Sequence, residues 1–382
     1  MIYIQSAVQI GAKCLCISRG GSASRFLHAA LAAGIAIGLI ASIGPATAAP
    51  KPDGSKQAVV AVEVAARAIR SFHRDGQDRR EVGKLIWRGG LVLNSPARDF
   101  GGYSGIELSP DGTEFLAVSD AGTWLGGRIR YADGRPTGIE RARLGPLLAL
   151  GQRRLAKSRD RDAEAIRLLD GTFERGRALI AFERNQRIGT FRLVRGAILE
   201  PISYLRPPDR LPSNKGLEAV TVIKGGRYRG AILAFAERSL DANGYHRGWI
   251  WKGGKVHRLG LVDVDGFDIT DAASLADGSV IVLERRFRWS EGVKFRLRLI
   301  RAEHIKPGAL LSGVTLIRAD MRYEIDNMEG LAIHQDRRGR TVLTLISDNN
   351  FNSILQRTLL LQFELPDQAL ARHAAATRTL DK

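Results

Sequence analysis

Cysteine is almost missing from this chain of 382 residues, which contains only Cys14 and Cys16, both near the N-terminus. Downstream of them the sequence has no means of forming a disulfide bond, a thiolate metal site or a cysteine nucleophile. Histidine is also scarce, with seven residues, and no two of them have the spacing of a metal-binding pair such as His-x-x-x-His. A metal site, if one exists, must therefore be built from oxygen ligands.

Two common catalytic signatures are absent as well. The sequence has neither the Gly-x-Ser-x-Gly turn of serine hydrolases nor the glycine-rich phosphate loop of nucleotide-binding proteins. Aromatic residues make up only 7% of the chain and do not alternate with the basic residues. This argues against a surface on which single-stranded nucleic acid stacks, and we expect no nucleic-acid partner.

Long apolar runs are limited to residues 27–43, which are rich in alanine. Basic residues precede this run, namely Lys13, Arg19 and Arg25. The small residues at 46–48 (Ala-Thr-Ala) follow it and resemble a cleavage site. We interpret residues 1–49 as a signal peptide, which predicts a periplasmic or secreted protein with no stable membrane span after cleavage. The alternative is a retained anchor, since 17 apolar residues are near the lower limit for a span.

Negative charge is under-represented: 58 lysines and arginines face 40 acids, giving a net charge of +18. Such an excess favours anionic partners, and we expect a small anionic, phosphorylated substrate and a monomeric protein. The alternative is that an arginine-rich composition merely reflects a solvated surface.

A repeated unit dominates the remaining sequence. Each copy has a small or acidic residue, an apolar run, a turn, a second apolar run and a closing acid. The five copies begin at Ser104, Glu164, Glu218, Asp271 and Glu329. Repeats of this length made of strand-like runs are typical of a propeller.

We therefore predict an all-β fold, a β-propeller with five blades at residues 84–366, closed by an N-terminal strand at residues 85–93. Sharing one blade between the two ends of the chain removes exposed sheet edges. A sixth, divergent blade, a β-sandwich and a pair of smaller β domains remain alternatives. Residues 50–83 are expected to form a linker or arm with weak structure, and residues 367–382 a fraying tail.

The spacing of the acids points to a site. Glu164 and Glu183, Glu218 and Glu237, and Glu329 and Asp348 are each separated by 19 residues, and Asp271 with Glu284 forms a looser pair. Antiparallel strands joined by a turn bring such positions together at one end of the hairpin. In a propeller these ends would surround one mouth of the central channel.

Crowded carboxylates need a counter-charge, and calcium takes six to eight oxygen ligands. The candidate metal ligands are Glu164, Glu183, Glu218, Glu237, Asp271, Glu284, Asn327, Glu329 and Asp348. Cationic side chains suited to binding an anionic substrate lie beside them, namely Arg184, Arg238, Arg285 and Lys215. Alternation along a strand predicts that not every arginine can face the mouth. The alternative for any single acid is a structural ion pair or a hydrogen bond to the next blade.

Several corner motifs together resemble the phytase-like family of exported bacterial proteins, described by an esterase-like activity of phytase. They are Asn214-Lys-Gly-Leu-Glu218-Ala, Asn327-Met-Glu329-Gly-Leu and Ser347-Asp-Asn-Asn350. The resemblance covers about residues 85–365. It implies a phosphoester or ester hydrolase, and the similar β-propeller phytases use calcium at a carboxylate-rich mouth.

The leading hypothesis is an exported, calcium-assisted hydrolase of phosphate esters, with Glu218, Glu329 and Asp348 as catalytic candidates. Two alternatives stay open. One is a calcium-dependent hydrolase of carboxylic esters or lactones. The other is a non-catalytic propeller that binds an anionic polymer or a protein, because a fold does not determine a function.

Overall fold

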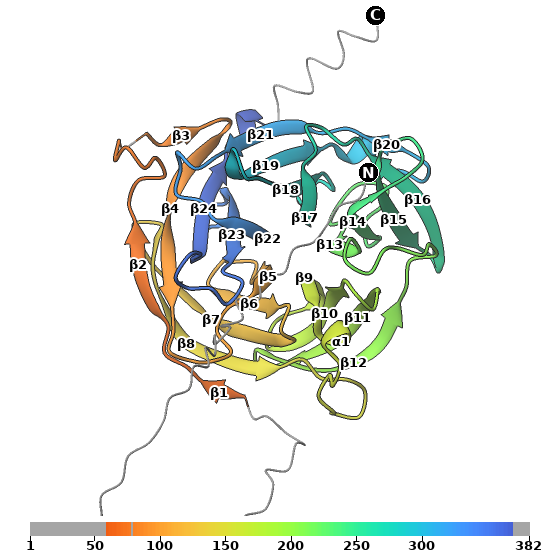
Figure 1. The fold of residues 1–382 in the computed structure, drawn as a ribbon, viewed down its shortest axis with the longest axis horizontal. Coiled ribbons are helices and arrows are strands. Elements are labelled where there is room, and N and C mark those ends of the chain that lie inside the picture. The colour runs from red at the N-terminus through yellow and green to blue at the C-terminus, as the bar shows by residue number, and fades with distance from the viewer. Residues whose placement is uncertain (1–58, 78, 370–382) are drawn as a thin grey trace, which may run out of the picture. The chain divides into compact units, whose positions relative to one another are not determined.

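Five β-sheets form a closed ring in the computed structural model, which describes residues 59–77 and 79–369 (Figure 1). The predicted signal peptide at residues 1–49 lies outside the described residues, as does most of the predicted tail. The five-bladed propeller expected from the repeats is confirmed. Helical structure in the described ranges comprises α1 (Ser158–Arg161), a short 3-10 turn at Ala302–His304 and residues 367–369.

Each blade has four principal antiparallel strands, the innermost of which lines the centre of the ring. Blade 1 contains β5 (Tyr103–Leu108), β6 (Glu114–Ser119), β7 (Thr123–Ala132) and β8 (Arg135–Pro146). Blade 2 contains β9 (Ala163–Gly171), β10 (Arg175–Phe182), β11 (Arg187–Val194) and β12 (Ala197–Leu205). Blade 3 contains β13 (Leu217–Val222), β14 (Ile232–Leu240), β15 (His246–Lys252) and β16 (Lys255–Leu261), with β20 (Leu310–Leu311) added in parallel.

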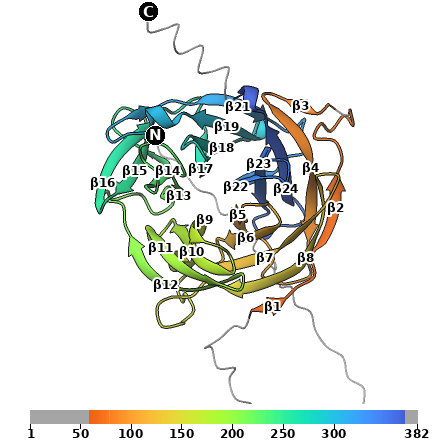
Figure 2. The ribbon, with the colours of Figure 1, turned by 180° about the vertical axis from the view of Figure 1, so that it is seen from behind.

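Blades 4 and 5 complete the ring. Blade 4 contains β17 (Asp268–Ser274), β18 (Val280–Arg288), β19 (Gly292–Ile300) and β21 (Val314–Ala319). Blade 5 contains β22 (Asn327–Gln335), β23 (Thr341–Asp348) and β24 (Thr358–Leu365) from the end of the chain, and β4 (Leu85–Asn94) from its beginning. Figure 2 shows β4 beside β24, so the predicted closure of the ring by an N-terminal strand is also confirmed.

The segment before β4 has more structure than the sequence suggested. β1 (Val60–Ala61) pairs with β8, and β2 (Ala65–Ile69) pairs with the outer edge of β4. β3 (Glu81–Val82) pairs with the first residues of β4. We expected a weakly structured arm because residues 50–83 are polar and charged apart from one apolar stretch. The residues in and just after that stretch instead pair with free sheet edges on two blades and cover those edges.

The hydrophobic core lies between adjacent blades. Its largest cluster joins blades 4 and 5 and is centred on aromatic residues. The ring of Phe72, from the N-terminal arm, lies 5.1 Å from Trp87 and 5.0 Å from Phe363, and all three side chains are fully buried. The arm is therefore part of the core. No helix in the described part of the chain has the length and apolar character needed to cross a bilayer.

Replacing Phe72 with alanine should reveal this role of the arm. Removing a buried phenylalanine leaves a cavity, and we expect a loss of about 3–5 kcal/mol in the free energy of unfolding. Denaturant unfolding followed by fluorescence would measure it. Val59→Ala, in the same arm but 44% exposed, is the matched control and should change stability by less than about 0.5 kcal/mol. Equal stability of both variants would show that the packing of the arm contributes little to the free energy of unfolding.

Candidate metal and substrate site

A bulge recurs at the same place in every blade. The pairing of the innermost strand with its neighbour skips one residue near the start of the innermost strand. The skipped residues are Ser104, Glu164, Glu218, Thr270 and Glu329. A bulge re-aims the side chain of its extra residue. It accounts for acids at equivalent corners of blades 2, 3 and 5.

A residue on the second strand of the blade completes each corner. It directly follows the residue that pairs with the position before the bulge. These residues are Asp120, Glu183, Glu237, Arg285 and Asp348. Together with the bulge acids they line a cavity of about 460 Å³, which receives residues from all five blades and is called the mouth below. The wall of the mouth contains eight carboxylates and one arginine.

Most of the predicted ligands meet in the mouth. Glu164, Glu183, Glu218, Glu237, Asn327, Glu329 and Asp348 all line it. The three catalytic candidates, Glu218, Glu329 and Asp348, are thus brought to one cavity from blades 3 and 5. Two acids outside the predicted ligand set join them: Asp162 and Asp120, the closing acid of the first repeat. Asp162 lies two residues before the bulge residue Glu164, and this short distance along the chain was the available signal.

The expectation for blade 4 was wrong by one residue on each strand. Asp271 and Glu284 were predicted as a corner pair, but the corner positions are held by Thr270 and Arg285. Because successive side chains of a strand point to opposite faces, a shift of one residue turns both acids away from the mouth. Neither of them lines the cavity.

Both displaced acids are fully buried in structural ion pairs. Asp271 lies 2.6 Å from the Arg167 guanidinium and accepts hydrogen bonds from the backbone N–H groups of Leu331 and Ala272. Glu284 binds Arg296 at 2.8 Å and Arg298 through both carboxylate oxygens. The structural alternative considered for single acids applies to these two. A buried acid with such partners is expensive to disrupt, since removing one partner leaves an uncompensated charge.

Of the predicted cationic residues, only Arg285 faces the mouth. Its Nε lies 3.1 Å from Glu329, and its guanidinium is 3.8 Å from Glu237. Arg184 is half exposed beside Asp162 at 3.0 Å, and Arg238 pairs with Asp268 at 2.7 Å. Lys215 is exposed on the strand connection before β13. These three residues do not line the cavity and stand around it.

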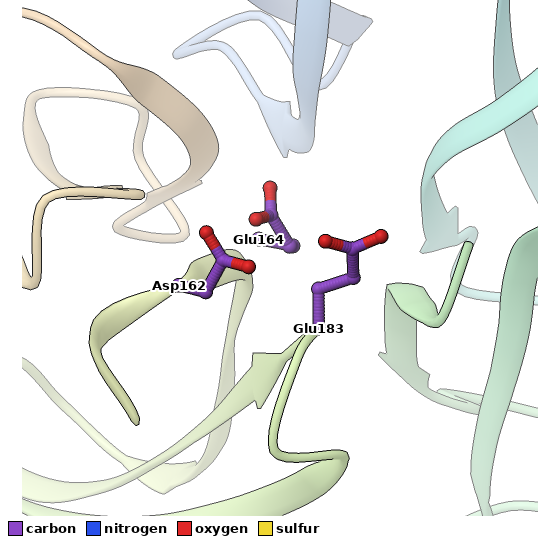
Figure 3. Close-up of side chains that lie close together, drawn as sticks. All are labelled: Asp162, Glu164 and Glu183. Atoms are coloured by element: carbon purple, nitrogen blue, oxygen red, sulfur yellow. The ribbon is translucent and has the colours of Figure 1, made fainter. Parts of the chain in front are cut away.

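Two groups of three carboxylates are close enough to hold a metal ion. Asp162, Glu164 and Glu183 each offer an oxygen within 4.8 Å of the others, and so do Glu183, Glu218 and Glu237. Figure 3 shows the carboxylates of the first group converging. Glu183 belongs to both groups, so two adjacent sites would share it as a bridging ligand. Hard oxygen donors of this kind suit calcium, and Asn214 and Asn327 add amide oxygens to the wall.

Most of the glutamates and aspartates that line the mouth resist ionisation. Burial raises the pKa of Glu183 to about 8, and repulsion from Asp162 adds to the effect. Burial likewise raises the pKa of Glu329 to about 8, against the opposing influence of Arg285. The pKa values of Glu164 and Glu218 lie well above the usual range, because burial and neighbouring carboxylates both disfavour the charged form. Without a cation, much of this mouth is protonated at neutral pH.

These shifts predict an unusual dependence of stability on pH. Between pH 6.5 and 8 the folded state holds protons on Glu183 and Glu329 that the unfolded state has already lost, so stability should fall as pH rises. The buried histidines have lowered pKa values, so their titration changes the stability only below about pH 6.5. We expect the melting temperature of chelator-treated protein to drop by several degrees over this interval, and added calcium to restore it most at pH 8.

The control for this experiment is a pair of variants measured by the same thermal scan. Glu183→Gln removes one titrating group and should flatten the fall between pH 6.5 and 8. Glu174→Gln, at an exposed turn away from the mouth, should keep it unchanged. A melting temperature that stays constant or rises with pH in the absence of calcium would contradict the electrostatic description of the mouth.

Comparison with solved structures finds a similarity to the endo-arabinase from Bacteroides thetaiotaomicron VPI-5482, with 13% sequence identity and a TM-score of 0.44 over 70% of this chain and 95% of the other. No curated protein matches the chain significantly. The family model for the phytase-like domain, described as esterase-like activity of phytase, matches residues 98–351, which include all five corners of the mouth. The chain therefore belongs to the phytase-like family.

Proposed function

We propose that this protein is an exported hydrolase of phosphate esters that uses calcium bound in the mouth. The observation that carries the proposal is the pair of carboxylate groups sharing Glu183, with Arg285 in the wall of the same cavity, 3.8 Å from Glu237. The family description supports hydrolysis of an ester. The apolar, alanine-rich run at residues 27–43 and the small residues after it support export to the periplasm or beyond.

The charge of the mouth indicates how an anion could enter it. Eight carboxylates would repel a phosphate ester unless their charge is neutralised by protons or cations. Asp162, Glu164, Glu183, Glu218 and Glu237 would hold the calcium, which when bound supplies positive charge and polarises phosphate oxygens and water. The fit rests on the convergence of these acids and on the raised pKa values of the four glutamates among them, which burial and neighbouring carboxylates keep from all being ionised without a cation.

Three residues remain for the chemical step. Arg285 would bind a phosphate oxygen through its guanidinium, which is suited to such contacts. Glu329, 3.1 Å from Arg285, is placed to accept the proton of the attacking water beside a phosphate held there. The new P–O bond would form as the ester P–O bond breaks, and the leaving alcohol would take up a proton. Asp348, whose pKa burial raises to about 6, is a second group able to exchange protons in this range.

The test is phosphate release from phytate and from an aryl phosphate, with calcium and again with a chelator. We expect release only with calcium, and a loss of at least about 100-fold in kcat for Glu329→Gln, because a general base typically contributes that much. Glu174→Gln is the matched control at an exposed position and should retain full activity. Melting curves would establish that each variant is folded.

The remaining outcomes separate the other candidate functions. Calcium-dependent cleavage of an aryl acetate or a lactone without phosphate release would identify a carboxylic ester hydrolase, an activity that the wording of the family description also admits. Absence of turnover on every substrate, by folded protein loaded with calcium, would overturn the catalytic proposal in favour of a binding role.

A further inference from the structure

Large apolar side chains project into solvent from two connections on the face that carries the mouth. The turn between β18 and β19 exposes Trp289 (94%) and Phe287 (48%). The connection between β23 and β24 exposes Ile354 (92%), Leu355 (79%) and Phe351 (46%). Soluble proteins rarely display such side chains together, and a concentration of them marks an interaction surface. We call these five residues the apolar rim.

Both connections border the mouth directly. Phe287 and Val293, at the two ends of the first turn, line the cavity, and so do Asn350 and Gln356 in the second connection. The two connections belong to blades 4 and 5, which are neighbours in the ring (Figure 1). The apolar rim therefore occupies one side of the entrance to the carboxylate site.

The apolar rim is held in place by polar contacts at its base. Glu291 binds Arg286 at 2.6 Å and also pairs with Arg288 and Lys294, which fixes the turn under Trp289. The rings of Phe287 and Trp289 meet edge to face at 5.4 Å. In the second connection, Asp348 accepts a hydrogen bond from the Asn350 backbone at 2.6 Å. The exposed side chains are thus presented on ordered segments, which lowers the entropy lost on binding.

The second connection also contains strained backbone. Asn350 and Phe351 have φ values of 47° and 51°, a region that a bulky side chain such as phenylalanine seldom adopts. The side chain of Asn349 stabilises this conformation by accepting hydrogen bonds from the Phe351 and Gly102 backbones. Strain retained at such a place is common where a segment serves binding.

The charges around the mouth indicate what the apolar rim meets. The turn that carries Trp289 has three basic side chains, Arg286, Arg288 and Lys294, around the single acid Glu291, and the chain as a whole carries a net charge of +18. A second copy of the chain would carry the same excess and be repelled. Tryptophan and aliphatic side chains beside arginine are the combination that binds the interface of an anionic lipid layer.

We propose that the face carrying the mouth docks on an anionic phospholipid surface, with Trp289, Ile354 and Leu355 inserted at the level of the headgroups. The binding itself does not depend on the proposed hydrolysis, because a lipid surface can hold the protein without turnover. Each buried anchor adds the free energy of transferring its apolar surface from water, and each exposed arginine adds attraction to the anionic lipids.

Vesicle flotation tests the docking. The mature protein is mixed with vesicles of phosphatidylcholine alone or with one-third phosphatidylglycerol, in the presence of a chelator so that calcium cannot bridge protein and lipid. We expect binding to the anionic vesicles that weakens with salt. The triple variant Trp289→Ser, Ile354→Ser, Leu355→Ser should bind at least 10-fold more weakly. Val194→Ser with Ile202→Ser, exposed apolar residues of blade 2 away from the apolar rim, is the matched control and should bind normally.

Tryptophan fluorescence gives a second, independent measurement. Of the five tryptophans, Trp87, Trp124 and Trp249 are fully buried, Trp251 is half-buried in blade 3, and Trp289 is almost fully exposed beside the mouth. Insertion should shift the emission of the protein to shorter wavelength when anionic vesicles are added, and Trp289→Phe should abolish that shift. Equal binding of the triple variant and the wild type would overturn the proposal. So would a wild-type protein that stays unbound, or one that forms dimers in solution that the triple variant does not form.

The outcome can be separated from that of the proposed hydrolysis. The three anchors do not line the mouth, so the triple variant should release phosphate from soluble phytate at the wild-type rate. Loss of vesicle binding with full phosphate release would confirm that the apolar rim serves docking alone. Vesicle binding without any phosphate release would leave the docking standing and remove the hydrolase.

Discussion

One buried ion pair joins the blades at the centre of the ring. Arg167 extends from β9 of blade 2 and donates hydrogen bonds to the carbonyl oxygens of Ile106 in blade 1 and Ala272 in blade 4. Its partner Asp271 accepts a hydrogen bond from Leu331 in blade 5. Four innermost strands thus depend on two side chains. Because a charge buried without its partner is costly, this arrangement holds the innermost strands, and with them the acids of the mouth, in fixed positions.

The acids of the mouth and the acids of the ion pairs illustrate two ways of burying a carboxylate. Asp271 and Glu284 have guanidinium partners and backbone donors, which satisfy their charge within the protein. The carboxylates around Glu183 have mainly one another, and their pKa values rise accordingly. The carboxylates of the mouth therefore lack a positive counter-charge within the protein, and this deficit favours the binding of a cation.

The repeat spacing was sufficient to predict the propeller, the closure by an N-terminal strand and most of the carboxylates of the mouth, because strand alternation and hairpin geometry are local. The 19-residue spacing works for three blades since their turns and bulges are equivalent. In blade 4 the sequence Thr270-Asp271 offers an acid one residue beyond the bulge, and nothing in the residue types tells which of the two is skipped. The partners of Asp271 and Glu284 lie on other strands and blades, so only the folded chain could assign their roles. The pairing of the arm with two distant sheet edges was invisible for the same reason.

The joining of the two ends of the chain in blade 5 has a consequence for how the protein is made. β4 is among the first strands to be synthesised, and its partner β24 is the last of the strands that the structure describes. Until β24 is available, β4 has an unpaired edge and blade 5 is incomplete, even when the other four blades have formed. A chain that crosses a membrane from its N-terminus would therefore finish its ring only after β24 has emerged. The order of synthesis makes an intact C-terminal strand the condition for a closed molecule.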